Sequence, residues 1–411
     1  MEIPGAPDQP DNHSAEAAQA MLHVRALSET IGPRPSCSPE EQSAAAYAAD
    51  RLAAMGWKQV TIEATSGAAS AYTRYALISG LAAAATLIAL LIRYPVMQSL
   101  AALLQLAAAQ AMLLESDFRR NGSRWLIPDR GSQNVIARQE AMSSPLQTIV
   151  LMAHLDTART PAFNASRRGQ HAYLLLFRGM MISFLAAALL HVALAILAVP
   201  ELAYVLLGIA GLQLSSSLLL TSFERTPYSP GAYDNASGAA CILALAGRLQ
   251  RQPLDNSEIW ICFTGCEETG AGGAVALFDR HAPSWKNPWI INLDQLGYSR
   301  MYLRTEEGLL RRHRTSAACL ALAQQVANSL PRLDFTLRPS QAFSDAAPAH
   351  QRGLRAFSLG SAPTEAEAPA HRHQISDLPE HLSESAFEAN LCYIWSLIRT
   401  LDTRAEEALH G

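Results

Sequence analysis

Four segments of this chain are apolar and contain no Asp, Glu, Lys or Arg, and they come in two pairs. The first pair is 75–92 and 96–114, and the second is 179–199 and 202–220. Because about 20 apolar residues span the hydrocarbon core of a bilayer, each pair predicts a transmembrane helical hairpin, at 75–114 and 179–220. The alternative is two helical hairpins buried in a soluble core. Gln98, Gln105 and Gln110 make the segment 96–114 a weaker candidate than its partner.

Outside the hairpins, residues 21–74, 115–178 and 221–411 have the patterning of one soluble domain. Apolar runs typical of strands alternate with helical patterns, which indicates an α/β sheet covered by helices. The predicted strands are KQVTIEAT, SQNVIAR, LQTIVLMAHLD, SEIWICFTGCEE, NPWIINLDQLG and LRAFSLGS. We expect the second and third of these to be neighbours in the sheet. Helical spacing is predicted for Ala15–Met55, interrupted by a loop after which Ser38 is the N-cap of the second helix. The other predicted helices are ASGAACILALAGRLQ, Thr315–Leu330 and Ser383–Leu401.

Composition excludes some classes of protein. The net charge of -4 offers no basic footprint for nucleic acid. Residues 1–20 are polar, lack the features of a secretory signal, and are predicted to form a disordered arm. The six cysteines form no CxxC pair and are typical of reduced thiols in a core. They are Cys37, Cys241, Cys262, Cys266, Cys319 and Cys392.

Acidic and histidine residues gather in short motifs, most of them directly after a predicted strand. They are His154, Asp156, Asp234, Glu267, Glu268, Asp294 and His373. Ligands of α/β sheets bind beyond the carboxyl ends of the strands. Carboxylate and imidazole ligands suit Zn²⁺ or a similar divalent ion, and a spare carboxylate suits a general base. The pattern therefore predicts a metal-dependent hydrolase, with Cys266 as an alternative ligand beside the two glutamates.

In this order the motifs resemble the M28 family of zinc aminopeptidases. The family pattern is H-x-D, D-N-x-S-G, a Glu–Glu pair, N-x-D, and a late His followed four residues on by Asp. The matching residues are His154-Leu155-Asp156, Asp234-Asn235-Ala236-Ser237-Gly238, Glu267–Glu268, Asn292-Leu293-Asp294 and His373–Asp377. The stretch LSETIGPRPSCSPEEQSAAAYAADRL is similar to the family's usual opening. The resemblance extends from about Met21 to Leu401, except over the two hairpins. It implies a single zinc-exopeptidase-like domain with a mixed, mostly parallel sheet.

The resemblance also implies two Zn²⁺ ions per chain and assigns their ligands. Asp234 would bridge the ions, His154 and Asp294 would complete one site, and Glu268 and His373 the other. The implied catalytic residues are Glu267, as the general base, and Asp156, which would orient His154. The implied reaction is hydrolysis of the amino-terminal peptide bonds of peptides or proteins.

Some positions depart from the family pattern. Cys266 stands where a small residue is usual, and Ser344-Asp345-Ala346 stands where Ser-Asp-His is common. His371 and His381 compete with His373 as the last ligand. The 80 residues between His154 and Asp234 exceed the family norm, and hairpin 179–220 accounts for the excess. Two other functions stay open, a glutaminyl-cyclase-like acyltransferase and a non-catalytic membrane scaffold, although the full ligand set argues against both.

The distribution of arginines predicts the orientation in the membrane. Of the two distal turns, one carries a single positive charge, Arg93, and the other a single negative charge, Glu201. Many arginines, in contrast, flank the bases of the hairpins. These are Arg74, Arg119, Arg120, Arg124, Arg167, Arg168, Arg178 and Arg225. The positive-inside rule then predicts a multi-pass protein of a bacterial inner (plasma) membrane with the catalytic domain in the cytoplasm. The expected partners are the lipid bilayer and peptide or protein amino termini, with no nucleic acid; the sequence is compatible with a homo-oligomer.

Overall fold

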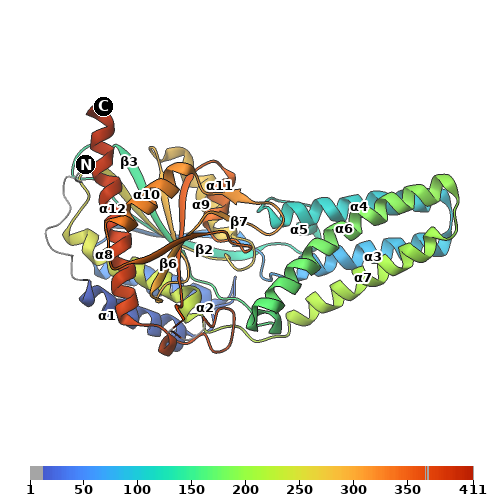
Figure 1. The fold of residues 1–411 in the computed structure, drawn as a ribbon, viewed down its shortest axis with the longest axis horizontal. Coiled ribbons are helices and arrows are strands. Elements are labelled where there is room, and N and C mark those ends of the chain that lie inside the picture. The colour runs from blue at the N-terminus through green and yellow to red at the C-terminus, as the bar shows by residue number, and fades with distance from the viewer. Residues whose placement is uncertain (1–12, 366, 368–369, 411) are drawn as a thin grey trace.

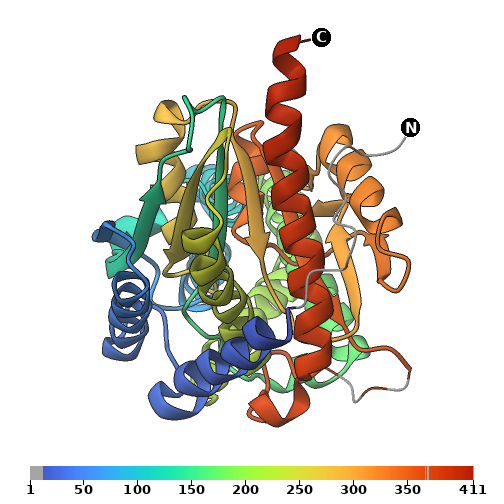
Figure 2. The same ribbon diagram turned by 90° about the vertical axis from the view of Figure 1, so that its left-hand side faces the viewer.

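The computed structural model describes residues 13–365, 367 and 370–410. An α/β domain forms one end of the molecule, and a bundle of long helices projects from it (Figure 1). The C-terminal helix α12 (Glu384–His410) lies on the side of the domain away from the bundle (Figure 1 and Figure 2).

An eight-stranded sheet forms the centre of the domain, in the order β1-β2-β4-β3-β5-β10-β6-β9. The strands β4, β3, β5 and β10 are mutually parallel, while β1, β2 and β6 introduce antiparallel pairs. The mixed α/β sheet is therefore confirmed. The strands are β1 Gln59–Gly67, β2 Arg130–Gln139, β3 Gln147–His154, β4 Ser257–Thr264, β5 Trp289–Leu293, β6 Arg300–Arg304, β9 Asp334–Arg338 and β10 Arg355–Ala362.

The expectation that β2 and β3 are neighbours is wrong, because β4 lies between them and pairs with both. β2 and β3 are close in sequence, yet β4 joins β2 in an antiparallel ladder and β3 in a parallel one. The sequence pattern of each strand indicates burial but does not indicate its partner.

Helices cover both faces of the sheet. One core is formed with α1 (Ser14–Arg25), α2 (Pro39–Ala54), α8 (Ser237–Arg251), α10 (Ala317–Asn328) and α12. The other is formed with α9 (Gly272–His281) and α11 (Ala346–Gln351). As predicted, the Ser38 hydroxyl caps α2 by accepting from the amide of Glu41, with Pro39 in the first turn. The short elements are η1 Ala26–Ile31, α5 Ser123–Leu126, η2 Ala162–Ala165, η3 Ala232–Ala236, η4 Ala282–Ser284, η5 Pro379–His381, β7 Glu306–Glu307 and β8 His313–Arg314.

The predicted arm at 1–20 is wrong at its C-terminal end. Helix α1 begins at Ser14, and Ala17 and Ala20 are buried in the core where α1 packs on α8 and α12. Residues spaced three and four apart share one face of a helix, so Ala17, Ala20, Met21 and Val24 form an apolar face. Residues 1–12 lie outside the described part of the chain.

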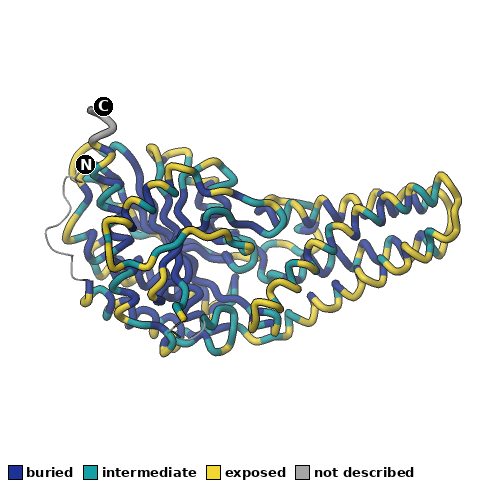
Figure 3. The backbone as a smooth tube through the Cα atoms, in the orientation of Figure 1, coloured by how far each residue is buried: buried dark blue, intermediate teal, exposed yellow. Residues whose placement is uncertain are grey.

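The two predicted hairpins form the projecting bundle. Their helices are α3 (Thr73–Ile92), α4 (Pro95–Ser116), α6 (Arg167–Leu197) and α7 (Leu202–Phe223), and each is long and apolar enough to cross a membrane. Helix α6 begins earlier than the expected 179, because the Ser166 hydroxyl caps it by accepting from the amide of Gly169. At most 44% of the most apolar window of any of these helices is buried, so the alternative of helices buried in a soluble core is wrong. Exposed positions run along the outside of the bundle (Figure 3), and many of them are leucine or isoleucine.

Polar side chains in the bundle face its interior and bind one another. Gln105 of α4 and Gln213 of α7 exchange amide hydrogen bonds of 3.2 and 3.0 Å. His191 of α6 contacts Thr86 of α3 at 2.9 Å and Gln98 of α4 at 2.6 Å. An apolar environment makes unpaired polar groups costly, so these pairs favour one alignment of the four helices. The glutamines that weakened segment 96–114 as a candidate thus have a packing role, except the exposed Gln110.

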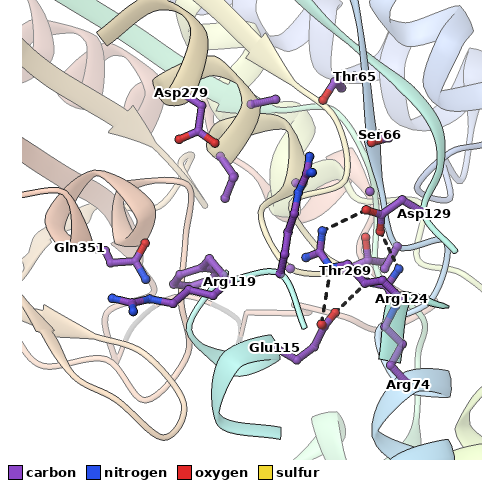
Figure 4. Close-up of a pocket in the computed structure, with 18 of the residues that line it drawn as sticks. Thr65, Ser66, Arg74, Glu115, Arg119, Arg124, Asp129, Thr269, Asp279 and Gln351 are labelled. Carbon is purple, nitrogen blue, oxygen red and sulfur yellow. Dashed lines mark hydrogen bonds and ion pairs between the residues drawn. The ribbon is translucent and has the colours of Figure 1, made fainter. Parts of the chain in front are cut away.

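Paired charges line a cavity of about 290 Å³ between the base of the first hairpin and the α/β domain (Figure 4). The buried guanidinium of Arg74 binds Glu115 at 2.7 Å and Asp129 at 2.5 Å. Arg124 binds the second oxygen of Asp129 at 2.9 Å. Removing one partner of a buried ion pair leaves an uncompensated charge, so these contacts fix the angle at which the hairpin leaves the domain.

We expect the protein to remain with the membrane fraction after alkaline carbonate washing and to need detergent for extraction. The reason is the apolar outer surface of the bundle, which water solvates poorly. The measurement is the partition of the full-length chain between pellet and supernatant. Release into the supernatant without detergent would contradict the membrane-spanning interpretation.

Candidate metal centre

Three predicted site segments meet because their strands are parallel neighbours. In β4, β3 and β5 the chain runs in one direction, so their carboxyl ends share one edge of the sheet. His154 is the last residue of β3, Glu267 and Glu268 follow β4, and Asp294 follows β5. Residues more than 100 positions apart in the chain, such as His154 and Glu267, therefore meet at one edge of the sheet.

Asp234 joins this edge from the segment that leads into α8. Its backbone dihedrals (φ −120°, ψ 90°) are not helical, and the Asp234–Asn235 peptide bond is cis. The amides of Tyr233 and Asp234 donate to the Asp377 carboxylate at 2.7 and 3.1 Å. Asp377 therefore fixes the backbone of Asp234 and does not make a hydrogen bond with His373 among the contacts described.

The two oxygens of Asp234 face different imidazoles. Oδ1 lies 3.3 Å from Nε2 of His154, and Oδ2 lies 3.0 Å from Nε2 of His373. His154 Nε2 is also 3.7 Å from Oδ1 of Asp294, and His373 Nε2 is 3.1 Å from Oε1 of Glu268. The candidate ligand atoms form three groups, two of which share Asp234, one with His154 and Asp294 and the other with Glu268 and His373. The third joins His154 with Glu267 and Glu268.

Asp156 supports both the histidine and the glutamate loop. Nδ1 of His154 lies 3.1 Å from the backbone carbonyl of Asp156 and 3.5 Å from its carboxylate. That carboxylate accepts from the amides of Glu267 and Glu268 at 3.0 and 3.1 Å, and from the Ser36 hydroxyl at 2.6 Å. Its main hydrogen bonds therefore hold the loop that carries the glutamates, a role that the sequence did not indicate.

Burial and mutual repulsion govern the protonation of the cluster. Burial raises the pKa of Glu267 well above its usual value, opposed by His154 and reinforced by Glu268 and Asp345. Burial alone would lower the pKa of His154, but the surrounding carboxylates, Glu267 first, raise it well above its usual value. Burial acts to raise the pKa of Asp234 as well, yet both imidazoles bring it far below its ordinary range. The two imidazoles thus supply positive charge that offsets the neighbouring carboxylates.

Two arginines that sequence reasoning missed, the buried Arg304 and the half-buried Arg372, also compensate this charge. Arg304 of β6 binds Asp294 at 2.7 Å, and Arg372 donates from Nε to Oδ2 of Asp234 at 2.9 Å. Asp345 is a further missed acid: burial first, then the nearby Asp156 and Asp294, raise its pKa to about 7, although His154 acts in the opposite direction. The sequence signals for these residues were the adjacency of Arg372 to His373 and the position of Asp345 in the Ser344-Asp345-Ala346 stretch.

Arg34 ties together the loops behind the site. Its fully buried guanidinium donates to five backbone carbonyls. They belong to Leu27, Gly32, Leu155, Pro230 and Gly231. Burial lowers the pKa of Arg34 to about 10, and Asp377, Asp156 and Asp234 act against that shift. The cation therefore links the N-terminal loop to the segments that carry His154 and Asp234.

The residues present fit a metal ion. Glu268 Oε1, Asp294 Oδ1 and His373 Nε2 are buried and make no hydrogen bond, although His373 Nε2 lies 3.1 Å from Glu268 Oε1 and buried polar atoms are usually satisfied. All three belong to the two ligand groups. A divalent cation would satisfy them and offset the repulsion between the carboxylates.

The competing ligands do not join this cluster. His371 binds the Ser376 hydroxyl at 2.7 Å and stacks on His381. The sulfur of Cys266 faces Cys37, and neither sulfur belongs to a metal-ligand group among the described residues. The expected burial of the cysteines holds for Cys241, Cys262, Cys266 and Cys319, whereas Cys37 and Cys392 are half-buried.

Removing bound metal should lower the melting temperature of the detergent-solubilised protein by several degrees. A ligand at roughly 1,000 times its Kd stabilises the folded state by about 4 kcal/mol. The measurement compares thermal unfolding after chelation and after return of Zn²⁺. In an Asp234→Ala control, which removes the shared ligand, chelator and Zn²⁺ should have little effect. Equal melting temperatures of the wild-type protein in both conditions would contradict a metal site.

Known proteins resemble this chain in sequence and in fold. Residues 217–398 match the sequence profile described as Peptidase family M28. Aminopeptidase YwaD of Bacillus subtilis strain 168 is 28% identical over 179 residues, which cover 40% of this chain and 36% of that protein. The alignment thus spans only about a third of this curated relative.

Solved structures share the fold over nearly the whole chain. BSAP, a zinc aminopeptidase from Bacillus subtilis, has a TM-score of 0.55 at 15% identity, covering 94% of this chain and 95% of that one. An Acidobacteriales bacterium glutaminyl cyclase has a TM-score of 0.56 at 12% identity, covering 98% and 100%. At such identities the likeness concerns the fold alone. The chain is therefore similar to peptidase family M28 in sequence over 217–398, and to solved zinc aminopeptidases in fold over nearly its whole length.

Proposed function

We propose that this protein is a membrane-anchored dizinc aminopeptidase that hydrolyses the amino-terminal peptide bonds of peptides or proteins. The observation that carries the proposal is the position of Asp234, whose two oxygens face two separate imidazole–carboxylate groups. The family match supports a zinc peptidase in particular.

The ligands divide between two ions as the geometry groups them. His154 and Asp294 would hold one ion, Glu268 and His373 the other, and Asp234 both. Bound Zn²⁺ would supply Lewis-acid activation of water and of the scissile carbonyl. Arg304 holds Oδ2 of Asp294, the oxygen that does not face His154, and so orients this carboxylate. Arg372 donates to Oδ2 of Asp234, the same oxygen that faces His373.

Glu267 is the carboxylate best placed to move the proton. Its Oε2 lies 3.9 Å from His154 Nε2, and its backbone amide is held by Asp156. Burial raises its pKa, and a carboxylate of raised pKa is a stronger base. Glu267 would take the proton from the attacking water and deliver it to the leaving amine. Asp156 acts as a positioning residue, because it fixes both His154 and the amides of the glutamate loop.

A Glu267→Gln substitution should lower kcat by about 10²–10⁴-fold and leave the metal content unchanged, since the amide cannot accept the proton. The measurement is hydrolysis of a panel of amino-terminal fluorogenic substrates, with metal analysis of the same samples. Glu201→Gln, the same change in the exposed distal turn, is the matched control and should keep wild-type activity. Undiminished activity of the Glu267→Gln variant would contradict the assigned role.

A glutaminyl-cyclase-like acyltransferase is the second candidate, because glutaminyl cyclases share the fold at similar TM-scores. Two complete ligand groups favour the dizinc peptidase. Including substrates with amino-terminal glutamine in the same panel separates the two activities: release of the amino acid supports the peptidase, and ring closure supports the cyclase. A non-catalytic scaffold is disfavoured by the retained cluster of buried ligands.

The domain is proposed to face the cytoplasm of a bacterial inner membrane. Both distal turns lie at the end of the bundle remote from the domain (Figure 1), with Arg93 in one and Glu201 in the other. Most of the other arginines lie at or beside the helix ends that join the domain, namely Arg74, Arg119, Arg120, Arg124, Arg167, Arg168 and Arg225, while Arg178 lies eleven residues inside α6. Under the positive-inside rule the two turns then face the opposite compartment.

Cysteines placed at position 95 or 200, in an otherwise cysteine-free chain, should react with an impermeant maleimide in cells whose outer membrane is permeable to the reagent. Both positions lie at the distal turns, which the proposed topology exposes outside the inner membrane. A cysteine in place of exposed Glu40, in the domain, is the control and should react only after lysis. The reverse pattern would overturn the orientation.

A further inference from the structure

Two cysteine thiols that the proposed reaction does not use lie against each other beside the metal centre. Sγ of Cys37 is 3.2 Å from Sγ of Cys266. Cys37 belongs to the loop before α2, and Cys266 directly precedes Glu267. These residues are far apart in sequence, so the tertiary structure alone brings the two sulfurs together.

One buried carboxylate holds the backbone of both cysteines. Glu41 accepts from the amide of Cys37 at 3.0 Å and from the amide of Cys266 at 2.8 Å. Both cysteines have positive φ, 63° and 56°, a conformation that L-residues rarely adopt. The carboxylate therefore fixes two unusual turns at a separation that directs one sulfur towards the other.

The surroundings leave room for the Cys266 side chain in this position. Gly67, at the end of β1, lies so close that a Cβ there would come within 2.6 Å of the Cys266 Cβ and 2.8 Å of its sulfur. Any larger residue at 67 would therefore displace Cys266. Cys37 contacts the carbonyls of Gly67 and Arg130 through its sulfur, each at 3.6 Å.

We propose that Cys37 and Cys266 are a redox pair, which a small-molecule disulfide converts reversibly into an intramolecular disulfide. An S–S bond is about 2.05 Å long, so the sulfurs must approach by roughly 1.2 Å. The bond would link the N-terminal loop to the loop that carries Glu267 and Glu268. These loops already share Asp156, through Ser36 on one side and the glutamate amides on the other. The pair would form whether or not the site hydrolyses peptides.

Exposure determines the order of the two steps. Cys37 is half-buried, whereas Cys266 is fully buried, so the reagent reaches Cys37 first. The Cys37 sulfur attacks one sulfur of the reagent, whose S–S bond breaks and releases one thiol with the proton from Cys37. The Cys266 sulfur then attacks the Cys37 sulfur and expels the second thiol with its own proton. Two protein thiols are oxidised, and one reagent disulfide is reduced to two thiols.

This chemistry suits the proposed location. Stable disulfides are rare in the reducing cytoplasm, where those that do form are usually transient or sense redox changes. Redox-sensor cysteines are often placed next to a resolving cysteine, as the half-buried Cys37 is placed next to Cys266. The cysteine pair would thus fasten the glutamate loop under oxidising conditions and release it under reducing ones.

The test treats the full-length protein in detergent with oxidised glutathione, alkylates the remaining thiols and maps the peptides by mass. We expect a Cys37–Cys266 link in the wild-type protein that dithiothreitol reverses. Cys266→Ala should retain glutathione on Cys37, because the resolving thiol is missing, and Cys37→Ser should form neither product. Cys392→Ser, which changes another half-buried cysteine, should behave as the wild type.

A second measurement requires no substitution. The oxidised wild-type protein should melt on the order of 5 °C higher than the reduced protein, because the bond closes a long loop in the unfolded chain. Glutathione retained on Cys37 of the wild-type protein, or Cys37 and Cys266 both still open to alkylation after unfolding of the oxidised sample, would overturn the proposal.

Discussion

The concentration of buried negative charge at one sheet edge is the constraint on which the rest of this structure depends. Asp234, Glu267, Glu268 and Asp294 meet there with two imidazoles, away from bulk water. Such a cluster is costly to fold unless cations compensate it. Arg304 and Arg372 supply part of the compensation, and three orphaned ligand atoms show where a divalent ion would supply more. The cluster is therefore a candidate metal site by charge as well as by geometry.

The loops that bear these acids are held by polar contacts behind them. Asp156 holds the amides of the glutamate loop, Asp377 holds the backbone at Asp234, and Arg34 joins five carbonyls from three segments. All three side chains bind backbone amides or carbonyls, and so fix the backbone from which the candidate ligands project. The bundle, in contrast, joins the domain through the Arg74–Glu115–Asp129 contacts at its base, and its long helices take no part in the metal centre.

Much of this organisation was predictable. The charge-free segments predicted the four long helices, and the strand patterns predicted β1–β5 and β10, because burial leaves a periodic or continuous apolar signature. The H-x-D, D-N-x-S-G, Glu–Glu and N-x-D motifs named the residues that the structure brings together. The first residues of helix α1, up to residue 20, were assigned to the arm although helical spacing was predicted from Ala15, because alanine gives little hydrophobic contrast. The place of β4 between β2 and β3, and the roles of Arg304, Asp345 and Glu41, were missed because they depend on contacts between distant segments.

The sequence by itself determined the elements, the candidate ligands and the presence of two apolar hairpins, since each is a local property of side-chain chemistry and spacing. Only the tertiary structure decided how these parts combine. The parallel alignment of β4, β3 and β5 placed three ligand segments at one edge, and the path of the chain into α8 set Asp234 between two imidazoles. The fold likewise brought Cys37 against Cys266. Contacts between residues distant in sequence depend on the packing of the whole domain, and no local pattern encodes them.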